Sequence, residues 1–396
     1  MIANVAASAN ARVYLDNNAT TPMVPEVIDA MLAVLQAVGN PSSKHADGDA
    51  ARARLGRARQ DVAQLFGASP AEIVFTSGAS EANHTALAAG WSAMQRRFPE
   101  RRAIVVSAIE HPSVLAAAQA LEARGAQVRI APVDADGVLD VAAYGQLLDE
   151  SVAIASVMWA NNETGAVQPV ARAAQIAHAA GALFHTDATQ ACGKIALDVR
   201  MVGADYASAS AHKLHGPAGV GALYVRKGAP FEALLPGSQE RGRRAGTENL
   251  AGIVGFAAAA QRALARLVPD AAQVQALRDA FEREVIAVVP MAVVNAAGAQ
   301  RLPNTSNVRI ARNGHAIDSD LMLIKLDHAG ISVSSGAACS AGENAPSHVL
   351  KAMGQSDAEA RASLRFSFSA LNTLTEAEAA AHALARIVLP LVCRAA

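Results

Sequence analysis

Short, continuously apolar segments alternate with helical segments through the first 225 residues of the chain. Strands are expected at 72–76, 103–108, 128–133, 152–159, 182–186, 206–209 and 221–225. Helices are expected among them at 80–90, 113–125 and 171–181. Strands that are apolar throughout are buried on both faces, as in parallel sheets covered by helices. The pattern therefore predicts an α/β fold with a mostly parallel sheet, whose ligands would bind beyond the carboxyl ends of the strands.

The remainder of the chain predicts a smaller α+β domain. A polar, glycine-rich segment at 237–249 precedes an alanine-rich helix at about 250–267. Further elements are expected as a helix near 272–288, strands at 306–310 and 363–369, a loop at 333–348 and a final helix. We predict a large domain of residues 18–265 and a small domain built from 1–17 and 266–396.

Composition excludes several classes of protein. With 396 residues, 52% apolar, the chain is long enough for two hydrophobic cores. A net charge of −1 argues against a broad nucleic-acid or membrane-surface patch, and no apolar run approaches the roughly 18 residues that span a bilayer. The three cysteines, Cys192, Cys339 and Cys393, are far apart, so neither a disulfide framework nor a structural zinc site is expected. Residues 1–11 lack the features of a secretory signal, and we expect a cytoplasmic protein.

Lys213 is the first candidate for chemistry. The chain has six lysines, and only Lys213 lies in a small, polar, glycine-flanked segment, preceded by Ser210 and His212 and followed by a Gly/Pro turn. A lysine partly removed from water is less often protonated and can attack a carbonyl carbon. The alternative is a lysine at a strand end that forms an ion pair with a carboxylate.

Residues at two other strand ends could bind a cofactor, one at a phosphate group and the other at a ring nitrogen. The segment around Ala79 and Ser80 opens a helix directly after a strand, which suits a phosphate, although a plain serine cap looks the same. Asp187 ends an apolar strand, and its carboxylate could hold a pyridinium N–H. The alternative for Asp187 is a metal site shared with His185, since residues i and i+2 of a strand share a face.

Three neutral side chains follow further strands. His111 could stack on a planar ring, move protons, or merely cap a helix. Asn162 and Gln190 could donate hydrogen bonds to a phenolic oxygen. Taken together, the reactive lysine, the aspartate, the phosphate cradle and the histidine indicate pyridoxal 5'-phosphate in the large domain of an aminotransferase-like fold.

At this point the chain resembles a known family. The resemblance rests on 14–22 (YLDNNATTP), 75–81 (FTSGASE), 110–114 (EHPSV), 161–165 (NNETG), 185–190 (HTDATQ), 210–213 (SAHK), 243–249 (RRAGTEN) and 334–340 (SSGAACS). These segments are similar, in order and from about residue 13 to 370, to those of cysteine desulfurases of the Nif/Isc branch of the class V aminotransferase superfamily. The resemblance implies a homodimer that converts L-cysteine to L-alanine and passes the sulfur, as an enzyme persulfide, to an iron–sulfur scaffold or another acceptor.

The resemblance also implies a role for each site residue. Lys213 would hold the cofactor as a Schiff base and move protons, and His111 would stack on the ring. Other cofactor contacts would come from Asp187, Gln190, Asn162, Ala79, Ser80, Ser210 and His212, and from Thr247 of the second subunit. Arg365, helped by Asn162, would bind the substrate carboxylate, a task that suits a guanidinium.

Cys339 would be the nucleophile that takes the sulfur. Its neighbours are small, with glycines on both sides, as expected of a loop that moves between substrate and acceptor. No resident metal is expected, although Cys339 could serve as a transient iron–sulfur ligand. Cys192 and Cys393 lack such surroundings and are expected to be inert.

Some features depart from the family pattern, and some alternatives stay open. Serine stands at Ser80 where the family often has threonine, the segment from Gly237 has fewer glycines, and the chain ends soon after Arg365, which leaves docking of a scaffold protein open. A selenocysteine lyase or cysteine-sulfinate enzyme of the same fold is one alternative. A non-catalytic sulfur or iron–sulfur carrier is another. The acceptor could serve nitrogenase, general iron–sulfur assembly or tRNA thiolation.

Overall fold

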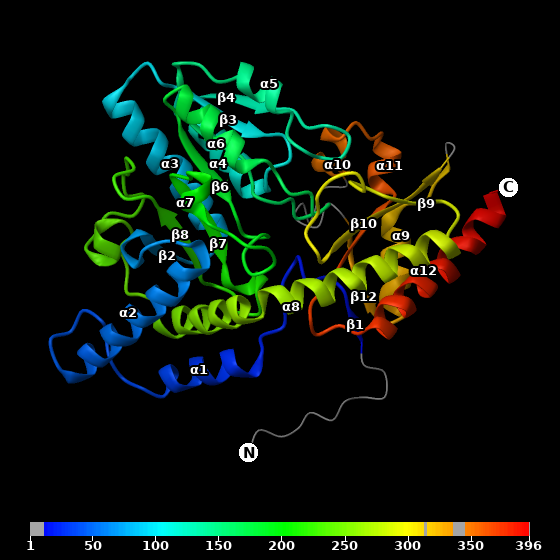
Figure 1. Ribbon diagram of the computed structural model, residues 1–396, viewed down its shortest axis with the longest axis horizontal. Coiled ribbons are helices and arrows are strands. Elements are labelled where there is room, and N and C mark those ends of the chain that lie inside the picture. The colour runs from blue at the N-terminus through cyan, green and yellow to red at the C-terminus, as the bar shows by residue number, and fades with distance from the viewer. Residues whose placement is uncertain (1–11, 313–314, 336–344, 396) are drawn as a thin grey trace.

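The computed structural model describes residues 12–312, 315–335 and 345–395, and its larger sheet is the predicted, mostly parallel one (Figure 1). The strand order is β2 (Ile73–Thr76), β8 (Gly221–Val225), β7 (Tyr206–Ser210), β6 (Leu183–Asp187), β5 (Val152–Ser156), β3 (Ala103–Ser107) and β4 (Gln127–Ala131). Strands β7, β6, β5, β3 and β4 run parallel, whereas β8 is antiparallel to both of its neighbours. Every strand except the edge strand β4 is fully buried, which explains their uniformly apolar sequences.

Helices cover both faces of this sheet. The elements of this part are α1 (Pro25–Leu35), α2 (Ala46–Phe66), α3 (Ala79–Arg97), α4 (Pro112–Glu122), α5 (Val141–Gln146), α6 (Val170–Ala179) and α7 (Val199–Val202), with short 3-10 turns η1 (Pro70–Glu72), η2 (Ala211–Lys213) and η3 (Gln239–Gly242). On one face, Leu87 and Trp91 of α3 pack with Ile154 in one hydrophobic cluster. On the other face, Phe66 of α2 and Phe184 of β6 belong to a second cluster. The order strand–helix–strand thus arises because each parallel connection needs a covering helix.

The second sheet is smaller and antiparallel. It is formed by β11 (His315–Ala316), β10 (Thr305–Arg312), β14 (Ser363–Ser367), β13 (Ser334–Ser335) and β9 (Ala292–Val294), with β1 (Val13–Tyr14) paired to β12 (Ile331–Ser332) beside it. Its helices are α9 (Ser319–His328), α10 (His348–Ala352), α11 (Asp357–Arg361) and α12 (Leu374–Ala395). Phe281, Phe366 and Phe368 pack in its core with their rings tilted to one another, and the ring centroids of Phe281 and Phe366 are 4.4 Å apart. Its hydrophobic cluster includes Leu15 and Val274, while the exact division of the chain into domains stays a prediction.

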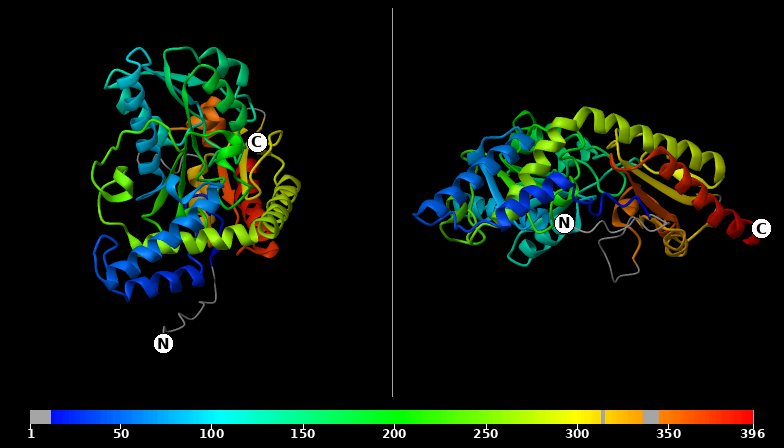
Figure 2. Two further views of the ribbon diagram at one scale, coloured as in Figure 1. Left: turned by 60° about the vertical axis from the view of Figure 1, so that its left-hand side comes forward. Right: turned by 90° about the horizontal axis from the view of Figure 1, so that it is seen from below.

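The two helices expected at 250–267 and 272–288 are in fact one helix, α8 (Leu250–Val288), so the predicted break is wrong. The helix continues through Pro269, although proline removes one backbone hydrogen bond of the ladder. Asp270, directly after the proline, forms ion pairs with Arg262 and Arg266 from the preceding turns, and these contacts help the helix to continue. Figures 1 and 2 show α8 running from beneath the larger sheet to lie along α12 beside the smaller one.

By length and composition alone, α8 is also the helix that could cross a membrane, within the part of the chain that the structure describes. The sequence analysis expected no apolar run long enough to span a bilayer, and by this criterion α8 is an exception. Nearly half of the relevant stretch, 44%, is buried against the rest of the protein. The alanine-rich sequence has a role in packing, because small side chains let α1, α2 and α12 approach closely.

Candidate active site

A cavity of about 480 Å³ opens at the carboxyl ends of the parallel strands. Its wall includes ten of the residues singled out in the sequence, drawn from both sheets: Ala79, Ser80, His111, Asn162, Asp187, Gln190, Ser210, His212, Lys213 and Arg365. The topology explains the assembly, because parallel strands end at the same edge of the sheet.

Lys213 lies at the end of η2, directly after β7, and is half-buried. Its Nζ atom donates hydrogen bonds to the backbone oxygens of Asn18, at 2.6 Å, and Ala19, at 2.7 Å. Both acceptors belong to the turn that follows β1, so the N-terminal segment reaches across and holds the lysine against the cavity. The amine that could attack a carbonyl is therefore positioned by neutral carbonyl groups.

Asp187 lies at the end of β6 and its carboxylate is held by two donors. Asn83 donates to Oδ2 at 2.7 Å and the Thr189 backbone N–H donates to Oδ1 at 2.9 Å. A carboxylate oxygen accepts more than one hydrogen bond, so Asp187 keeps capacity to bind a ring N–H in the cavity.

His185, two residues earlier, does not share a metal with Asp187. Its ring nitrogens face the hydroxyls of Ser156 and Ser208 on the neighbouring strands, at 2.8 and 3.0 Å. Burial lowers its pKa to about 4, although the nearby Asp187 charge acts in the opposite direction. No group of three or more His, Cys, Asp or Glu side chains among the described residues could hold a metal. His185 is a neutral core histidine.

His111 is both a helix cap and part of the cavity wall. Its Nδ1 accepts a hydrogen bond from the Ser113 backbone N–H at 3.1 Å and lies 2.8 Å from the Ser113 hydroxyl. Burial lowers the pKa of His111, the Asp187 charge raises it, and the Lys213 charge lowers it further. With Nδ1 occupied as an acceptor, the neutral ring carries its proton on Nε2. Of the three roles left open by the sequence, capping is observed, while ring stacking and proton transfer stay predictions.

The far end of the cavity is suited to an anion. Gly78 caps α3, whose first-turn N–H groups have no partner within the helix, and Ser80 and Ser210 contribute hydroxyls. A side chain at Gly221 would put its Cβ 2.7 Å from the Gly78 Cα, so only glycine allows β8 to approach this loop. His212, next to Lys213, has its pKa lowered to about 4 by burial and by the charges of Lys213 and Lys194, so it meets an anion as a neutral ring.

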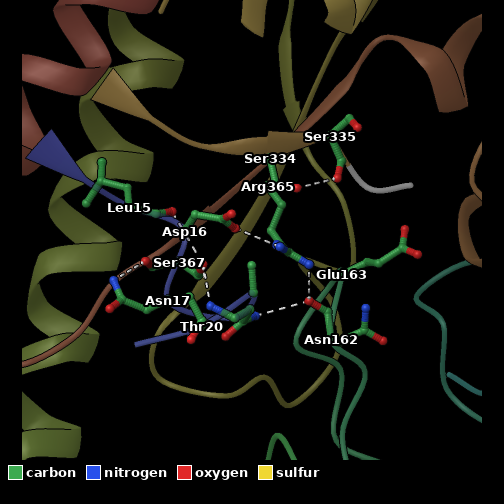
Figure 3. Close-up of polar contacts among 12 residues, drawn as sticks. Leu15, Asp16, Asn17, Thr20, Asn162, Glu163, Ser334, Ser335, Arg365 and Ser367 are labelled. Carbon is green, nitrogen blue, oxygen red and sulfur yellow. Dashed lines mark hydrogen bonds and ion pairs between the residues drawn. The ribbon is translucent and has the colours of Figure 1, made fainter. Parts of the chain in front are cut away.

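Arg365 approaches the cavity from β14 of the smaller sheet (Figure 3). Its guanidinium is only 2% exposed and donates to Asp16 Oδ1 at 2.7 Å and to the Asn162 backbone oxygen at 3.1 Å. Its buried Nε atom has no hydrogen-bond partner among the described residues. A buried guanidinium with donors to spare at the cavity edge suits a carboxylate ligand.

The sequence analysis assigned no role to four residues at this site: Asn18, Glu110, Glu163 and Lys194. Glu163 is buried beside Arg365 and accepts a hydrogen bond from the Ser347 hydroxyl at 2.5 Å, and burial raises its pKa to about 7, against the opposing effects of Ser347 and Arg365. Each of the four lies inside or next to a segment that was singled out, but their burial was not visible in the sequence.

Two expected residues are not among the described residues of the cavity wall. Cys339 falls in 336–344, outside the described residues. Thr247 is exposed and lines a neighbouring pocket with Ser77, Gly219 and Arg244 rather than the main cavity of its own chain. Cys192 is buried beneath the site, and burial raises the pKa of its thiol, which makes it a poor nucleophile.

The donor set fits the expected cofactor. A lysine amine, a carboxylate, amide donors and an anion cradle line one cavity of sufficient volume, and Thr189 presents a buried hydroxyl at the wall that has no partner among the described residues. Lys213, Asp187, Gln190 and the α3 N-terminus are the groups that would hold pyridoxal phosphate.

Comparison with known proteins agrees with this chemistry. The family model described as aminotransferase class-V matches residues 13–379. A cysteine desulfurase of Cereibacter sphaeroides is 48% identical over 95% of this chain and 96% of that protein, and the cysteine desulfurase NifS of Azotobacter vinelandii is 44% identical over 92% and 90%. A solved NifS-like protein superimposes with a TM-score of 0.87 at 36% identity, covering 96% of this chain and 99% of that one.

Proposed function

The chain belongs to the class-V aminotransferase family and is a pyridoxal-phosphate-dependent cysteine desulfurase, and from that premise we propose how its residues divide the reaction. L-cysteine is the substrate, L-alanine is one product, and the sulfur passes to an acceptor. The observation that carries the assignment of roles is the single cavity that Lys213, Asp187, Gln190 and Arg365 share. The non-catalytic carrier considered from the sequence gives no reason for this set of groups.

Pyridoxal phosphate, when bound, supplies an electron sink that weakens the bonds at Cα and Cβ of cysteine. Lys213 Nζ would hold the cofactor, and once free it would take the proton from Cα of the substrate and return it there as alanine forms. Asp187 would accept the ring N–H, and Gln190 would donate to the phenolic oxygen. Arg365 and Asn162 would bind the substrate carboxylate and so orient Cα toward Lys213. His111 covers the ring as a neutral imidazole.

We propose Cys339 as the sulfur acceptor within the enzyme. Its sulfur forms a bond with the substrate sulfur while the Cβ–S bond breaks, and the thiol proton ends on Cβ, so that the products are alanine and a persulfide. Ser347, which anchors the chain just after 336–344, binds the buried Glu163 next to Arg365. This contact supports the assignment, because it holds the base of the Cys339 segment close to the substrate carboxylate site.

A dimer in a reducing compartment completes the proposal. Thr247 lies outside the cavity of its own chain, and α1 presents Ile28, Leu32 and Leu35 as an exposed apolar stripe, 41%, 42% and 67% exposed. A second copy that covers this stripe and supplies Thr247 would account for both features. A cytoplasmic reaction follows from the need for a reduced thiol at Cys339.

The first test is the visible spectrum of the purified protein, together with sulfide and alanine release from L-cysteine in the presence of a dithiol, which reduces the enzyme persulfide and frees its outer sulfur as sulfide. Wild type is expected to be yellow and to form both products in equal amounts. Cys339→Ala should stay yellow and lose sulfide release by roughly two orders of magnitude, because the acceptor thiol is gone. Cys192→Ala is the matched control and should keep its activity.

Each other outcome has a distinct meaning. A colourless wild type contradicts the role of Lys213. A yellow Cys339→Ala with full sulfide release removes Cys339 from the mechanism while leaving the cofactor site intact. Selenide release from selenocysteine that survives in Cys339→Ala, while sulfide release is lost, would support the lyase alternative.

A further inference from the structure

Lys194 is a second lysine beside the active site, and it contacts residues of the cavity wall without lining the main cavity itself. It lies four residues after Gln190, and its Nζ atom lies 2.6 Å from Gln190 Oε1 and 3.0 Å from Asn18 Oδ1. It does not line the main cavity but lines a smaller one, of about 60 Å³, on the opposite side of Lys213. Its contacts are therefore with the residues that face the cofactor rather than with the cofactor.

The contact with Gln190 decides which end of its amide faces the cavity. A lysine side chain donates hydrogen bonds and, when charged, cannot accept one. Lys194 therefore selects the oxygen of Gln190, and the amide nitrogen points away from it, where it donates to the Asn18 backbone oxygen at 3.0 Å. Because Gln190 lines the cavity and an amide nitrogen carries two hydrogens, its second N–H is available to an oxygen of a bound ligand.

Asn18 links the same contacts to the rest of the site. Its backbone oxygen accepts from both Lys213 and Gln190, and its side-chain amide donates to the Asn162 backbone oxygen at 3.1 Å. Asn304 donates to its Oδ1 at 2.9 Å, next to the contact from Lys194. Asn18 thus contacts Lys213, Gln190, Asn162 and Asn304, and Lys194 contacts both Asn18 and Gln190.

We propose that Lys194 is a positioning residue for the desulfurase reaction: acting through Gln190 and Asn18, it turns the donor face of Gln190 toward the phenolic oxygen of the cofactor. This inference rests on the proposed roles of Lys213 and Gln190. Gln190 held in this orientation would donate a hydrogen bond to that oxygen. Such a donor would favour the unprotonated oxygen, so Lys194 would lower the pH at which the bound cofactor changes its visible absorption.

The surroundings of Lys194 oppose its positive charge, so its role rests on the hydrogen bonds that it donates to Gln190 and Asn18. Burial holds the pKa of Lys194 well below its ordinary value, the charges of Lys213 and Arg365 add to that effect, and Cys192 acts against it. Arg365 is itself paired with Asp16. From α8, Arg262 and Asp270 line the same small cavity, as does His215, whose pKa is lowered by burial and also by the Arg262 and Lys194 charges.

The test is a pH titration of the visible absorption band of the holoenzyme. Lys194→Met should raise the midpoint by about one pH unit, because the hydrogen bond to Gln190 Oε1 is lost and the amide is free to turn. Lys194→Arg keeps both donors and the charge, and should restore the wild-type midpoint. Lys227→Met, at an exposed lysine after β8, is the matched control and should not shift it.

A double substitution tests whether Lys194 acts through Gln190. Gln190→Met should shift the midpoint in the same direction, and Lys194→Met should add little to it, since two residues acting through one contact are not additive. If Lys194→Met does not retain the cofactor, Lys194→Gln, which keeps a donor without the charge, should give an intermediate shift. A yellow variant with an unchanged midpoint overturns the proposal even if its activity falls. A colourless wild type would instead overturn the role of Lys213.

Discussion

At the scale of the residue, Glu110 joins the two loops that line one side of the cavity. Its Oε1 accepts hydrogen bonds from the Ser107 hydroxyl at 2.6 Å and the Met158 backbone N–H at 2.7 Å. It is completely buried, and burial raises its pKa to about 8, which the Asp187 charge reinforces and the hydrogen bonds from Ser107 and Met158 oppose. Glu110 is therefore protonated in the folded protein near neutral pH, and it fixes the position of His111, the next residue.

Proton linkage at Glu110 should be measurable. The folded-state pKa lies above that of an unfolded glutamate, so the contribution to stability is complete at acidic pH and is lost as the pH rises through about 8. Glu110→Gln mimics the protonated acid and lacks this loss. Relative to wild type, the variant should gain up to about 1.4 kcal/mol of unfolding free energy per pH unit between about pH 5 and pH 7.

Urea unfolding of both proteins across this pH range is the measurement. Glu122→Gln, on the exposed end of α4, is the control and should follow wild type at every pH. Parallel curves for wild type and Glu110→Gln would mean that the pKa of Glu110 is not raised in the folded protein, and would contradict this prediction.

At the scale of the element, a buried ion pair stabilises the backbone conformation of the segment around η3. Glu240 and Arg241 have φ values of +48° and +58° although neither is glycine. Glu240 forms a two-pronged pair with Arg59 of α2, at 2.6 Å for both contacts, and accepts from the Phe75 backbone N–H. The segment with fewer glycines than the family pattern is thus held by side chains instead, and it leads directly to Thr247.

Removing the arginine should be costly. Arg59→Met leaves the Glu240 carboxylate buried without its partner, and we expect the free energy of unfolding to fall by about 3–5 kcal/mol. Arg57→Met, an exposed arginine of the same helix, should change it by less than about 0.5 kcal/mol. Denaturant unfolding of the two variants provides the comparison, and equal effects would mean that the ion pair does not hold the segment.

At the scale of the whole molecule, the site is built between two sheets. The larger sheet supplies Lys213 and Asp187, the smaller sheet supplies Arg365, and α8 connects the two. Figure 1 shows the N-terminal segment entering between them, where Asp16 pairs with Arg365 and Asn18 accepts from Lys213. Among the described residues, a single chain therefore supplies all ten of the expected cavity-wall residues, and Thr247 is the exception.

Mixing inactive variants tests whether Thr247 comes from a second copy. Lys213→Ala and Thr247→Ala should each have low desulfurase activity. If two copies share Thr247, mixed dimers contain one intact site, and an equal mixture refolded together should recover about a quarter of wild-type activity. If Thr247 serves its own chain, no mixed site is intact, so an inactive mixture that sedimentation shows to contain mixed dimers contradicts the shared site.

The sequence by itself determined the type of fold and most of the site. Continuously apolar strands can be buried only in a sheet covered on both faces, and the polar residues that follow them must then gather at one edge. For this reason Lys213, Asp187, Gln190 and His111 could be named from local pattern alone, and motif similarity added Arg365.

Only the tertiary structure decided the features that depend on contacts between distant residues. The continuation of α8 through Pro269 depends on ion pairs and on packing against other helices, which a local pattern does not contain. Lys194 looked like an ordinary surface lysine, and its role became visible when the turn after β1 placed Asn18 against it. Burial is a property of the whole fold, and burial is what turns a lysine or a glutamate in the sequence into a part of the active site.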